Sequence, residues 1–154
     1  MIIYMMKKYQ KYFMLNKNIL LAFAASIIVS AIVAHILSDL ADFLNTTYTL
    51  AVDYLVYFSV FSCLYYFDSR KKYILASGQI DKSKLRHDLI KIITSLGIGE
   101  VVYTVVRWLL QYYFLQLDFE AYFASIASQA ISTIIYLVVV NLSVKMTRLY
   151  KDGN

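Results

Sequence analysis

Three ionisable residues, His35, Asp39 and Asp42, stand at positions i, i+4 and i+7 near the end of a long apolar stretch. This spacing predicts one shared face if the stretch forms a single helix. Imidazole and carboxylate groups are possible ligands for manganese, iron or zinc, so the trio is a candidate metal site, although the chain has no HxxxH or HExxH motif. At membrane depth the same groups are also candidates for a proton or cation pathway.

A second group of polar residues is predicted further along the chain. Asp53 lies near the start of the next apolar stretch, and Arg107 is the only one of the 15 Lys and Arg residues that lies deep inside such a stretch and not at its end. A buried guanidinium needs a carboxylate partner, which we expect to be Asp39 or Asp53. Arg107 belongs to a polar stripe with helical spacing, formed by Glu100, Tyr103, Thr104, Arg107 and Gln111.

Three interpretations of these residues stay open. In the first interpretation Arg107 forms a structural ion pair between helices. In the second, surplus carboxylates form a cation or proton pathway, in which Glu100 is the acid that lies deepest from water. In the third interpretation Arg107 binds an anionic headgroup, because a guanidinium engages phosphate in bidentate fashion. The candidate residues for a substrate or ion pathway are His35, Asp39, Asp42, Asp53, Glu100, Tyr103 and Arg107.

Membrane-spanning helices must position these residues. A span needs about 20 apolar residues, and four stretches qualify, at about 19–43, 47–67, 89–115 and 121–144. The first two are separated only by residues 44–46, so we expect them to form a hairpin. The sequence therefore predicts an all-α integral membrane protein, an antiparallel bundle of four transmembrane helices that forms one domain over residues 1–154.

The positions of the cations predict the orientation. Fourteen of the 15 Lys and Arg residues lie before residue 18, between Arg70 and Lys91, or from Lys145 onward. Because Lys- and Arg-rich segments stay in the cytoplasm, both termini and the loop 68–88 are predicted to be cytoplasmic, in a multi-pass protein of the cell membrane. The expected partners are the bilayer, with anionic headgroups at the cytoplasmic face, and other copies or subunits packed on helix faces.

Composition excludes several classes of function. Hydrophobic residues make up 60% of the chain, and the mean hydropathy of +0.59 is that of a membrane protein. The net charge of +5 comes from loop cations, so no nucleic-acid partner is expected. The chain lacks a GxSxG motif and a phosphate-binding glycine loop, and we expect no cofactor. Asn45-Thr46-Thr47 is a glycosylation sequon in the predicted external loop, which makes Asn45 a modification candidate.

Two segments of the second half resemble a known family. Ser95-Leu96-Gly97-Ile98-Gly99 opens the third predicted span, and the fourth runs from Ala124-Ser125 to Val140-Asn141-Leu142-Ser143-Val144-Lys145. Together with the four-span size, these segments resemble the GtrA-like polyprenyl-phosphate carriers. The first span lacks the family's Gly/Asn-rich opening, and residues 65–70 depart from its aromatic and Asn-Arg ending. The resemblance implies movement of a lipid-linked sugar or its carrier lipid for cell-surface glycan synthesis, and no individual functional residue is carried over.

Three classes of function follow from these observations. We expect a non-enzymatic carrier or flippase-like protein that handles a charged or lipid-linked substrate through the intramembrane polar residues. The first alternative is an accessory structural subunit of a larger membrane complex, because small residues such as Ser125, Ser128 and Ser132 let membrane helices approach closely. The second alternative is an intramembrane metal-dependent enzyme, which would depend on His35 and its neighbouring acids.

Overall fold

The protein is all-α in a computed structural model, which describes residues 2–147 together with the side chains of residues 9–94 and 96–143. In chain order the elements are α1 (Ile2–Ile36), α2 (Asp42–Ser69), the short 3-10 helix η1 (Arg70–Lys72), α3 (Lys82–Ser95), α4 (Gly97–Gln116) and α5 (Ala121–Thr147). Within this described part of the chain there is no β-strand. The predicted all-α class is therefore confirmed.

Three helical segments are long and apolar enough to cross a membrane, namely Tyr9–Ile36, Asp42–Lys72 and Ala121–Ser143. A fourth results if Lys82–Thr94 and Gly97–Gln116, which are bent by 55° relative to each other, count as one broken span. These lengths and compositions are those of a multi-pass membrane protein.

The first connection does not lie where the sequence predicts it. α1 ends at Ile36 and α2 begins at Asp42, so residues 44–46 are helical instead of forming the loop. The Nδ2 atom of Asn45 donates to the carbonyl oxygens of Ala34 and Leu37, both at 2.9 Å. Carbonyl groups at the end of a helix lack partners within the helix. A side chain of α2 therefore caps α1, which ends earlier than its apolar run suggests.

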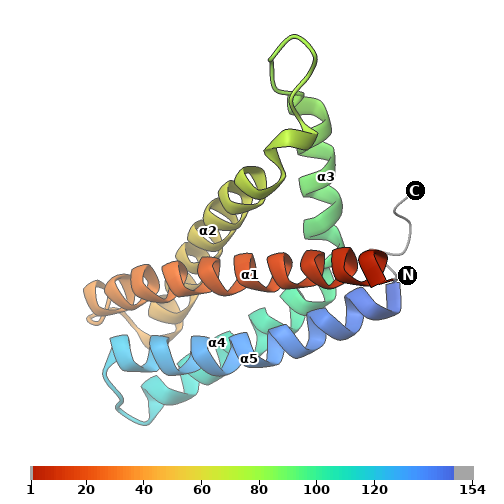
Figure 1. The fold of residues 1–154 in the computed structure, drawn as a ribbon. Coiled ribbons are helices and arrows are strands. Elements are labelled where there is room, and N and C mark those ends of the chain that lie inside the picture. The colour runs from red at the N-terminus through yellow and green to blue at the C-terminus, as the bar shows by residue number, and fades with distance from the viewer. Residues whose placement is uncertain (1, 148–154) are drawn as a thin grey trace.

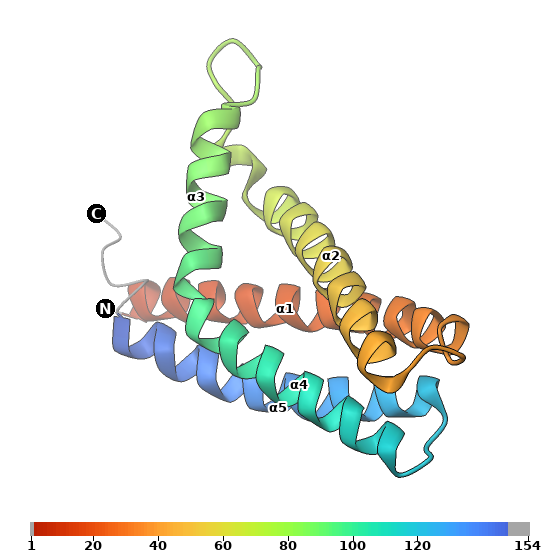
Figure 2. The same ribbon diagram turned by 180° about the vertical axis from the view of Figure 1, so that it is seen from behind.

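Four long helices surround one core (Figures 1 and 2). α1 packs against α2 and α5, and α4 packs against the same two helices. Phe23 of α1 lies in the middle, with its ring centroid 4.5 Å from that of Tyr57, 5.0 Å from Tyr103 and 5.2 Å from Tyr136. These tyrosines come from α2, α4 and α5, so one aromatic layer joins all four helices.

The outer surface of this bundle is apolar, whereas its interior holds large polar side chains. Ile28, Leu55 and Ile134 are 64%, 69% and 66% exposed, while Arg107 and Gln129 are 0% exposed. In water such an arrangement is unfavourable, because large aliphatic side chains are normally buried. In a bilayer it is favourable, since lipid tails solvate the aliphatic surface and polar groups must find partners inside the protein.

The two helical hairpins, α1–α2 and α4–α5, bury the same pattern of positions. Every buried residue of α2 has a buried counterpart 79 positions later in α5: Asn45/Ala124, Thr46/Ser125, Thr49/Ser128, Asp53/Ser132, Tyr57/Tyr136 and Phe61/Val140. Buried residues of α4 match buried residues of α1 81 positions earlier, as in Asn18/Gly99, Ala22/Tyr103, Ser26/Arg107 and Ser30/Gln111. The hydroxyl oxygens of Tyr57 and Tyr136 lie 3.2 Å apart. The hairpins are therefore equivalent packing units, although most of the paired residues differ in type.

α3 departs from the bundle. It is bent by 55° from α4, so the expected third span at 89–115 is divided near Leu96 into two helices of different direction. In Figures 1 and 2, α2 and α3 lean together and meet away from α1, where the turn with Gly78 connects them. The Asp81 side chain accepts a hydrogen bond from the Lys84 backbone N–H at 3.0 Å and caps the start of α3.

Gly99 marks a close approach of α4 to α5 and gives a test of this packing. A Cβ atom on Gly99 would lie 2.5 Å from Val140 Cγ2 and 3.1 Å from a ring carbon of Tyr136, whereas one on Gly97 would meet nothing within 4 Å. We expect Gly99→Ala to lower the free energy of unfolding by about 1–3 kcal/mol through overpacking. Gly97→Ala, the matched control, should leave it unchanged or slightly raised. Thermal unfolding in one detergent compares the two, and equal stability would contradict the observed helix contact.

Candidate functional site

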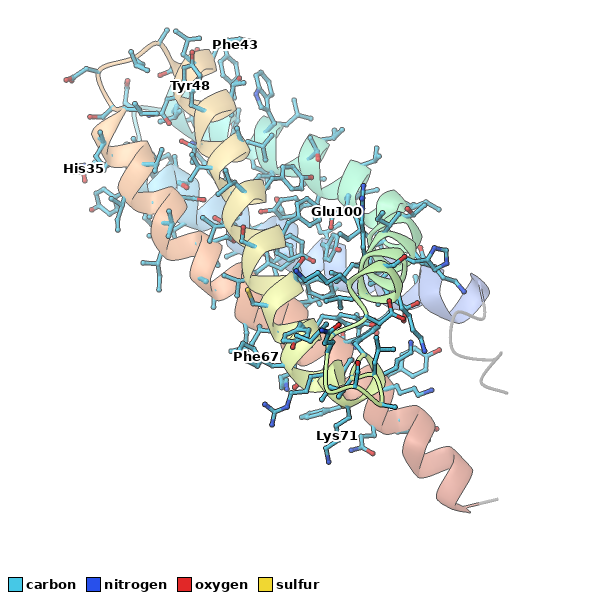
Figure 3. The ribbon with its side chains drawn as sticks, turned by 90° about the horizontal axis from the view of Figure 1, so that it is seen from above. His35, Phe43, Tyr48, Phe67, Lys71 and Glu100 are labelled. Atoms are coloured by element: carbon cyan, nitrogen blue, oxygen red, sulfur yellow. The ribbon has the colours of Figure 1, made fainter. Side chains whose placement is uncertain are left out.

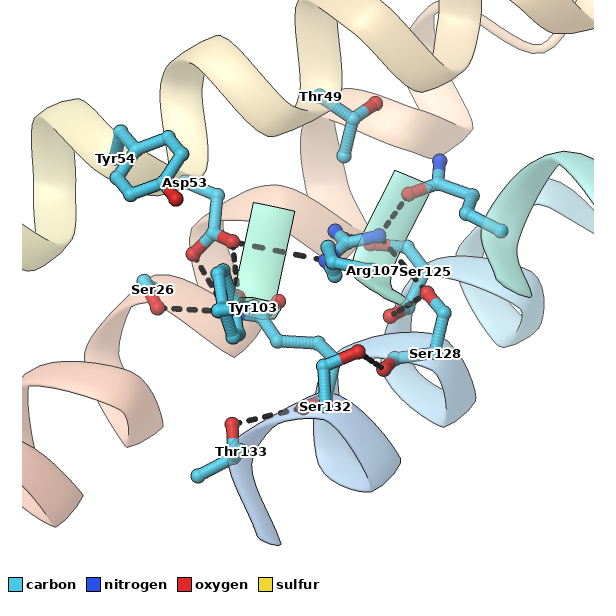
Figure 4. A network of polar contacts seen from close by, with 12 residues as sticks. Ser26, Thr49, Asp53, Tyr54, Tyr103, Arg107, Ser125, Ser128, Ser132 and Thr133 are labelled. Atoms are coloured by element: carbon cyan, nitrogen blue, oxygen red, sulfur yellow. Dashed lines mark hydrogen bonds and ion pairs between the residues drawn. The ribbon is translucent and has the colours of Figure 1, made fainter. Parts of the chain in front are cut away.

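Eight polar side chains from the four long helices form one buried group, the Asp53–Arg107 cluster (Figure 4). Each is at most 1% exposed. The members are Ser26 of α1, Asp53 of α2, Tyr103, Arg107 and Gln111 of α4, and Ser125, Ser128 and Gln129 of α5. Because every helix contributes, the cluster depends on the whole bundle being assembled.

An ion pair lies at the centre of the cluster. Arg107 Nε is 3.6 Å from Asp53 Oδ2. The same carboxylate oxygen accepts a hydrogen bond from the Tyr103 hydroxyl, and Asp53 Oδ1 accepts one from Gln129 Nε2 at 2.6 Å. Gln129 Nε2 also donates to Ser26 Oγ at 2.7 Å. Neutral donors from two helices, α4 and α5, therefore solvate the carboxylate in place of water.

Neutral acceptors surround the guanidinium in the same way. Arg107 Nη1 donates to Gln111 Oε1 and, at 2.8 Å, to Ser128 Oγ, and Nη2 donates to Ser125 Oγ at 3.2 Å. Both Nη atoms are thus bound to protein oxygens, and the side chain is 0% exposed. This geometry favours the structural ion pair over an anion site among the interpretations of Arg107, and it selects Asp53 over Asp39 as the partner.

The network continues from the cluster to the first connection. Gln111 Nε2 donates to Asn45 Oδ1 at 3.2 Å, and Asn45 in turn caps α1. Asn45 is only 2% exposed, and its Nδ2 atom, to which a glycan would be attached, already donates to two carbonyls. In this structure the sequon is therefore closed to glycan transfer, and Asn45 has a structural role.

Glu100 lies on α4 beside the aromatic layer. Its Oε1 atom accepts a hydrogen bond from the Tyr136 hydroxyl at 2.7 Å, and its backbone oxygen accepts from Tyr54 at 3.1 Å and from Thr104 at 2.7 Å. Its Oε2 atom is buried without a hydrogen-bond partner, and none of the ion pairs among the described residues includes Glu100. Glu100 therefore neighbours the cluster but does not share the Arg107 charge.

The predicted trio of His35, Asp39 and Asp42 does not join this cluster, and the prediction of one shared helical face is wrong. Only His35 belongs to α1, Asp39 lies in the connection, and Asp42 opens α2. His35 is exposed, and its ring packs edge-on against Tyr122 with 6.3 Å between centroids. Asp42 accepts a hydrogen bond from Gln116 Nε2 at 2.6 Å. Across the described residues, no group of three or more His, Cys, Asp or Glu side chains is placed to hold a metal ion.

Four members of the cluster are not among the residues predicted for a site. Ser26 belongs to the first apolar span, and Ser125, Ser128 and Gln129 belong to the packing face of the fourth span. The available signal was their type: a hydroxyl and an amide buried in a span must bond to something, and an ionised partner is favourable. The sequence does not indicate which partner they reach, because that depends on how the hairpins pack.

A cavity of about 370 Å³ lies at the other end of the bundle, where α2 and α3 diverge from α1. We call it the α1–α2–α3 cavity. Its lining comprises Lys11, Met14, Leu15 and Asn18 of α1, Phe61, Tyr65, Asp68 and Ser69 of α2, Lys72 of η1, and Asp88, Lys91 and Ile92 of α3. Apolar and charged side chains thus share one cavity at the end of the bundle that carries most of the described cations (Figure 3).

The acids of this cavity are already engaged. Asp68 Oδ2 lies 3.1 Å from Lys17 Nζ and accepts a hydrogen bond from Asn18 Nδ2 at 3.0 Å. Asp88 pairs with Lys72 and accepts a hydrogen bond from the Tyr73 hydroxyl at 2.8 Å. Burial raises the pKa of Asp88, but the hydrogen bonds from Lys72 and Tyr73 outweigh it and bring the pKa below its ordinary value.

Lysines therefore exceed aspartates around the cavity. Lys11, Lys72 and Lys91 line it and Lys17 flanks it, against the two aspartates Asp68 and Asp88. Asn18 is 3% exposed, and its Oδ1 atom has no hydrogen-bond partner within the described part of the chain. An anion with an apolar portion matches this lining in charge and in character.

The two sites differ in what they offer a ligand. The Asp53–Arg107 cluster is buried, and only Arg107 Nε and Gln129 Oε1 among its described polar side-chain atoms lack a hydrogen-bond partner. The α1–α2–α3 cavity has volume, more lysines than aspartates and apolar walls. No protein-family model, no curated protein and no solved structure matches the chain. The geometry of these two sites therefore carries the functional argument.

Replacement of Arg107 tests the structural role of the cluster. Arg107→Ala leaves Asp53 buried without its counter-charge, so we expect the free energy of unfolding to fall by about 3–5 kcal/mol. Arg107→Lys keeps a charge but cannot reproduce the guanidinium contacts with two serines and a glutamine, so an intermediate loss is expected. The double change Asp53→Asn with Arg107→Gln should recover part of the loss, because no net charge remains buried. Thermal unfolding measures the series; wild-type stability in Arg107→Ala would contradict a buried ion pair.

Proposed function

We propose that the chain is an integral membrane protein in which α1, α2, α4 and α5 form an antiparallel bundle of four transmembrane helices. The apolar outer surface supports this placement. The distribution of Lys and Arg supports cytoplasmic termini and a cytoplasmic η1–α3 region. In this orientation α3 lies at the cytoplasmic interface and the α1–α2–α3 cavity opens from the cytoplasmic half of the bundle.

We further propose that the protein is a non-enzymatic carrier, flippase-like in action, for an anionic lipid-linked substrate. The observation that carries this proposal is the α1–α2–α3 cavity, because it combines an excess of lysines with an apolar lining. Phosphate or pyrophosphate would pair with the lysines, and the first apolar carbons of the lipid would contact Met14, Leu15 and Phe61.

The other parts of the molecule agree with a carrier. The Asp53–Arg107 cluster holds the two hairpins together in the outer half. The ends of α2 and α3 can therefore lean away from α1 in the inner half without loss of the bundle. The sequence segments that resemble the GtrA-like carriers suggest the same class of substrate, a polyprenyl phosphate with or without a sugar.

Cysteine labelling tests the orientation. The single Cys63 is exposed on α2, so the variants are made in a Cys63→Ser background. Thr46, in the external loop that the sequence predicts, is unsuitable for labelling because it is 0% exposed. Ser38 in the first connection and Ser83 in α3 are both exposed. With intact cells, an impermeant maleimide should modify Ser38→Cys and spare Ser83→Cys until the membrane is opened. The reverse pattern would overturn the proposed orientation.

Transport in proteoliposomes tests the carrier. A fluorescent short-chain isoprenyl phosphate is placed in both leaflets, and an impermeant reductant measures how fast the inner pool becomes accessible. We expect the protein to accelerate this exchange, and Met14→Trp, which fills part of the cavity, to slow it several-fold. The control is Phe13→Trp, the neighbouring position, which is 69% exposed and outside the cavity.

Two results would contradict the carrier. Equal exchange by Met14→Trp and Phe13→Trp would remove the cavity from the route. No exchange by wild-type protein, combined with a complex of fixed stoichiometry with other proteins in blue-native gels of native membranes, would favour the accessory-subunit alternative.

A further inference from the structure

A second hollow lies between α2 and α3, on the flank of α3 that faces away from the α1–α2–α3 cavity. This groove, of about 260 Å³, is lined by Ser62 of α2 and by Lys82, Leu85, Arg86, Leu89, Ile90 and Ile93 of α3. The two hollows share no lining residue. α3 therefore separates two different surfaces, and the carrier proposal uses only the first.

The groove leaves apolar side chains of α3 uncovered. Ile90 is 54% exposed, and Leu85, Leu89 and Ile93 are partly exposed. α3 packs mainly against the start of α4, from which it bends away by 55°. An aliphatic surface of this kind at a membrane interface is favourable only where acyl chains or another apolar group cover it.

Two cations stand at the same groove. Lys82 and Arg86 are four positions apart, so they share one side of α3 with Leu89 and Ile93. Neither belongs to an ion pair of the described residues, unlike Lys72, which pairs with Asp88 on the opposite flank of α3. The groove thus presents two uncompensated positive charges beside an aliphatic strip.

We propose that this groove binds one anionic phospholipid of the cytoplasmic leaflet, with its phosphate between Lys82 and Arg86 and an acyl chain along Leu85, Leu89 and Ile93. Charge complementarity selects this occupant: Arg86 engages a phosphate through paired N–H groups, and Lys82 adds a point charge. A zwitterionic lipid gains less, because its choline or ethanolamine opposes the two cations. The inference rests on the proposed membrane location but not on the carrier activity, since the groove and the cavity are separate.

Lipid retention measured by native mass spectrometry tests the site. Protein in nanodiscs of equal parts phosphatidylglycerol and phosphatidylcholine is released in the mass spectrometer, and the retained lipids are counted. We expect one phosphatidylglycerol to be retained preferentially by wild-type protein. The double variant Lys82→Ala/Arg86→Ala should retain it about 30-fold more weakly, from roughly 1 kcal/mol for each cation near an anionic lipid.

The matched control is Lys71→Ala/Lys84→Ala, which removes the same charge from exposed positions outside the groove; Lys71 is visible in Figure 3. Retention of phosphatidylglycerol by this control would support a site at Lys82 and Arg86. Equal loss in both double variants would show diffuse attraction to the basic surface and overturn the proposal. Equal retention of the two lipids by wild-type protein would also overturn it.

A second measurement detects lipid beside the groove through a label on α2. Cys63 is exposed on α2 next to Ser62, so a small fluorophore attached to it reports on lipid nearby. Brominated phosphatidylglycerol should quench this label more strongly than brominated phosphatidylcholine at the same mole fraction, and Lys82→Ala/Arg86→Ala should remove the difference. Equal quenching by both lipids in wild-type protein contradicts the site, whether or not the carrier assay succeeds.

Discussion

A buried ion pair determines how the two hairpins face each other. Asp53 belongs to the first hairpin and Arg107 to the second, and both side chains are at most 1% exposed. An isolated charge in such surroundings costs several kcal/mol, whereas a pair surrounded by oriented neutral groups is tolerated. The serines, glutamines and tyrosine around the pair are therefore needed in these positions, and so are the helices that carry them. The register of all four long helices depends on this one contact.

The equivalence of the two hairpins makes the charge arrangement easier to understand. The position that corresponds to Asp53 in the second hairpin is Ser132, and the position that corresponds to Arg107 in the first is Ser26. The bundle thus has two equivalent pairs of positions. One pair holds the Asp53–Arg107 ion pair, and the other holds the hydroxyl groups of Ser132 and Ser26. Gln129 reaches both, because it bonds to Asp53 and to Ser26. The bundle is regular in packing but asymmetric in charge.

The two ends of the bundle also differ. In the half of the bundle near the first connection, Gln111 and Asn45 extend the cluster to the end of α1. The atoms there without a hydrogen-bond partner among the described residues are Ser30 Oγ, Thr46 Oγ1, Arg107 Nε and Gln129 Oε1. In the half near α3, α2 and α3 lean away from α1 and border hollows instead of a tight core. The buried polar cluster and the two hollows thus lie in different halves of one small bundle.

Part of this arrangement could be predicted from the sequence. The helical class follows from the apolar runs, and Asp53 was one of two expected partners for Arg107, because few acids lie at a similar depth. The His35, Asp39 and Asp42 trio was misplaced because Asn45, a side chain of the next helix, ends α1. The break near Leu96 is not marked by a proline. The cavity depends on how the consecutive elements α1, α2, η1 and α3 are placed in space. These features depend on tertiary contacts that local spacing does not reveal.

The order of the charges along the chain has a consequence for biosynthesis. If the helices span a membrane as proposed, the first hairpin leaves the ribosome before the second, and Asp53 enters the membrane region while Arg107 has not yet been synthesised. During that interval the acid must be neutral or remain close to water, since the bilayer offers it no cation. In the proposed topology we therefore expect membrane insertion to be completed late, when the second hairpin supplies the counter-charge of Asp53.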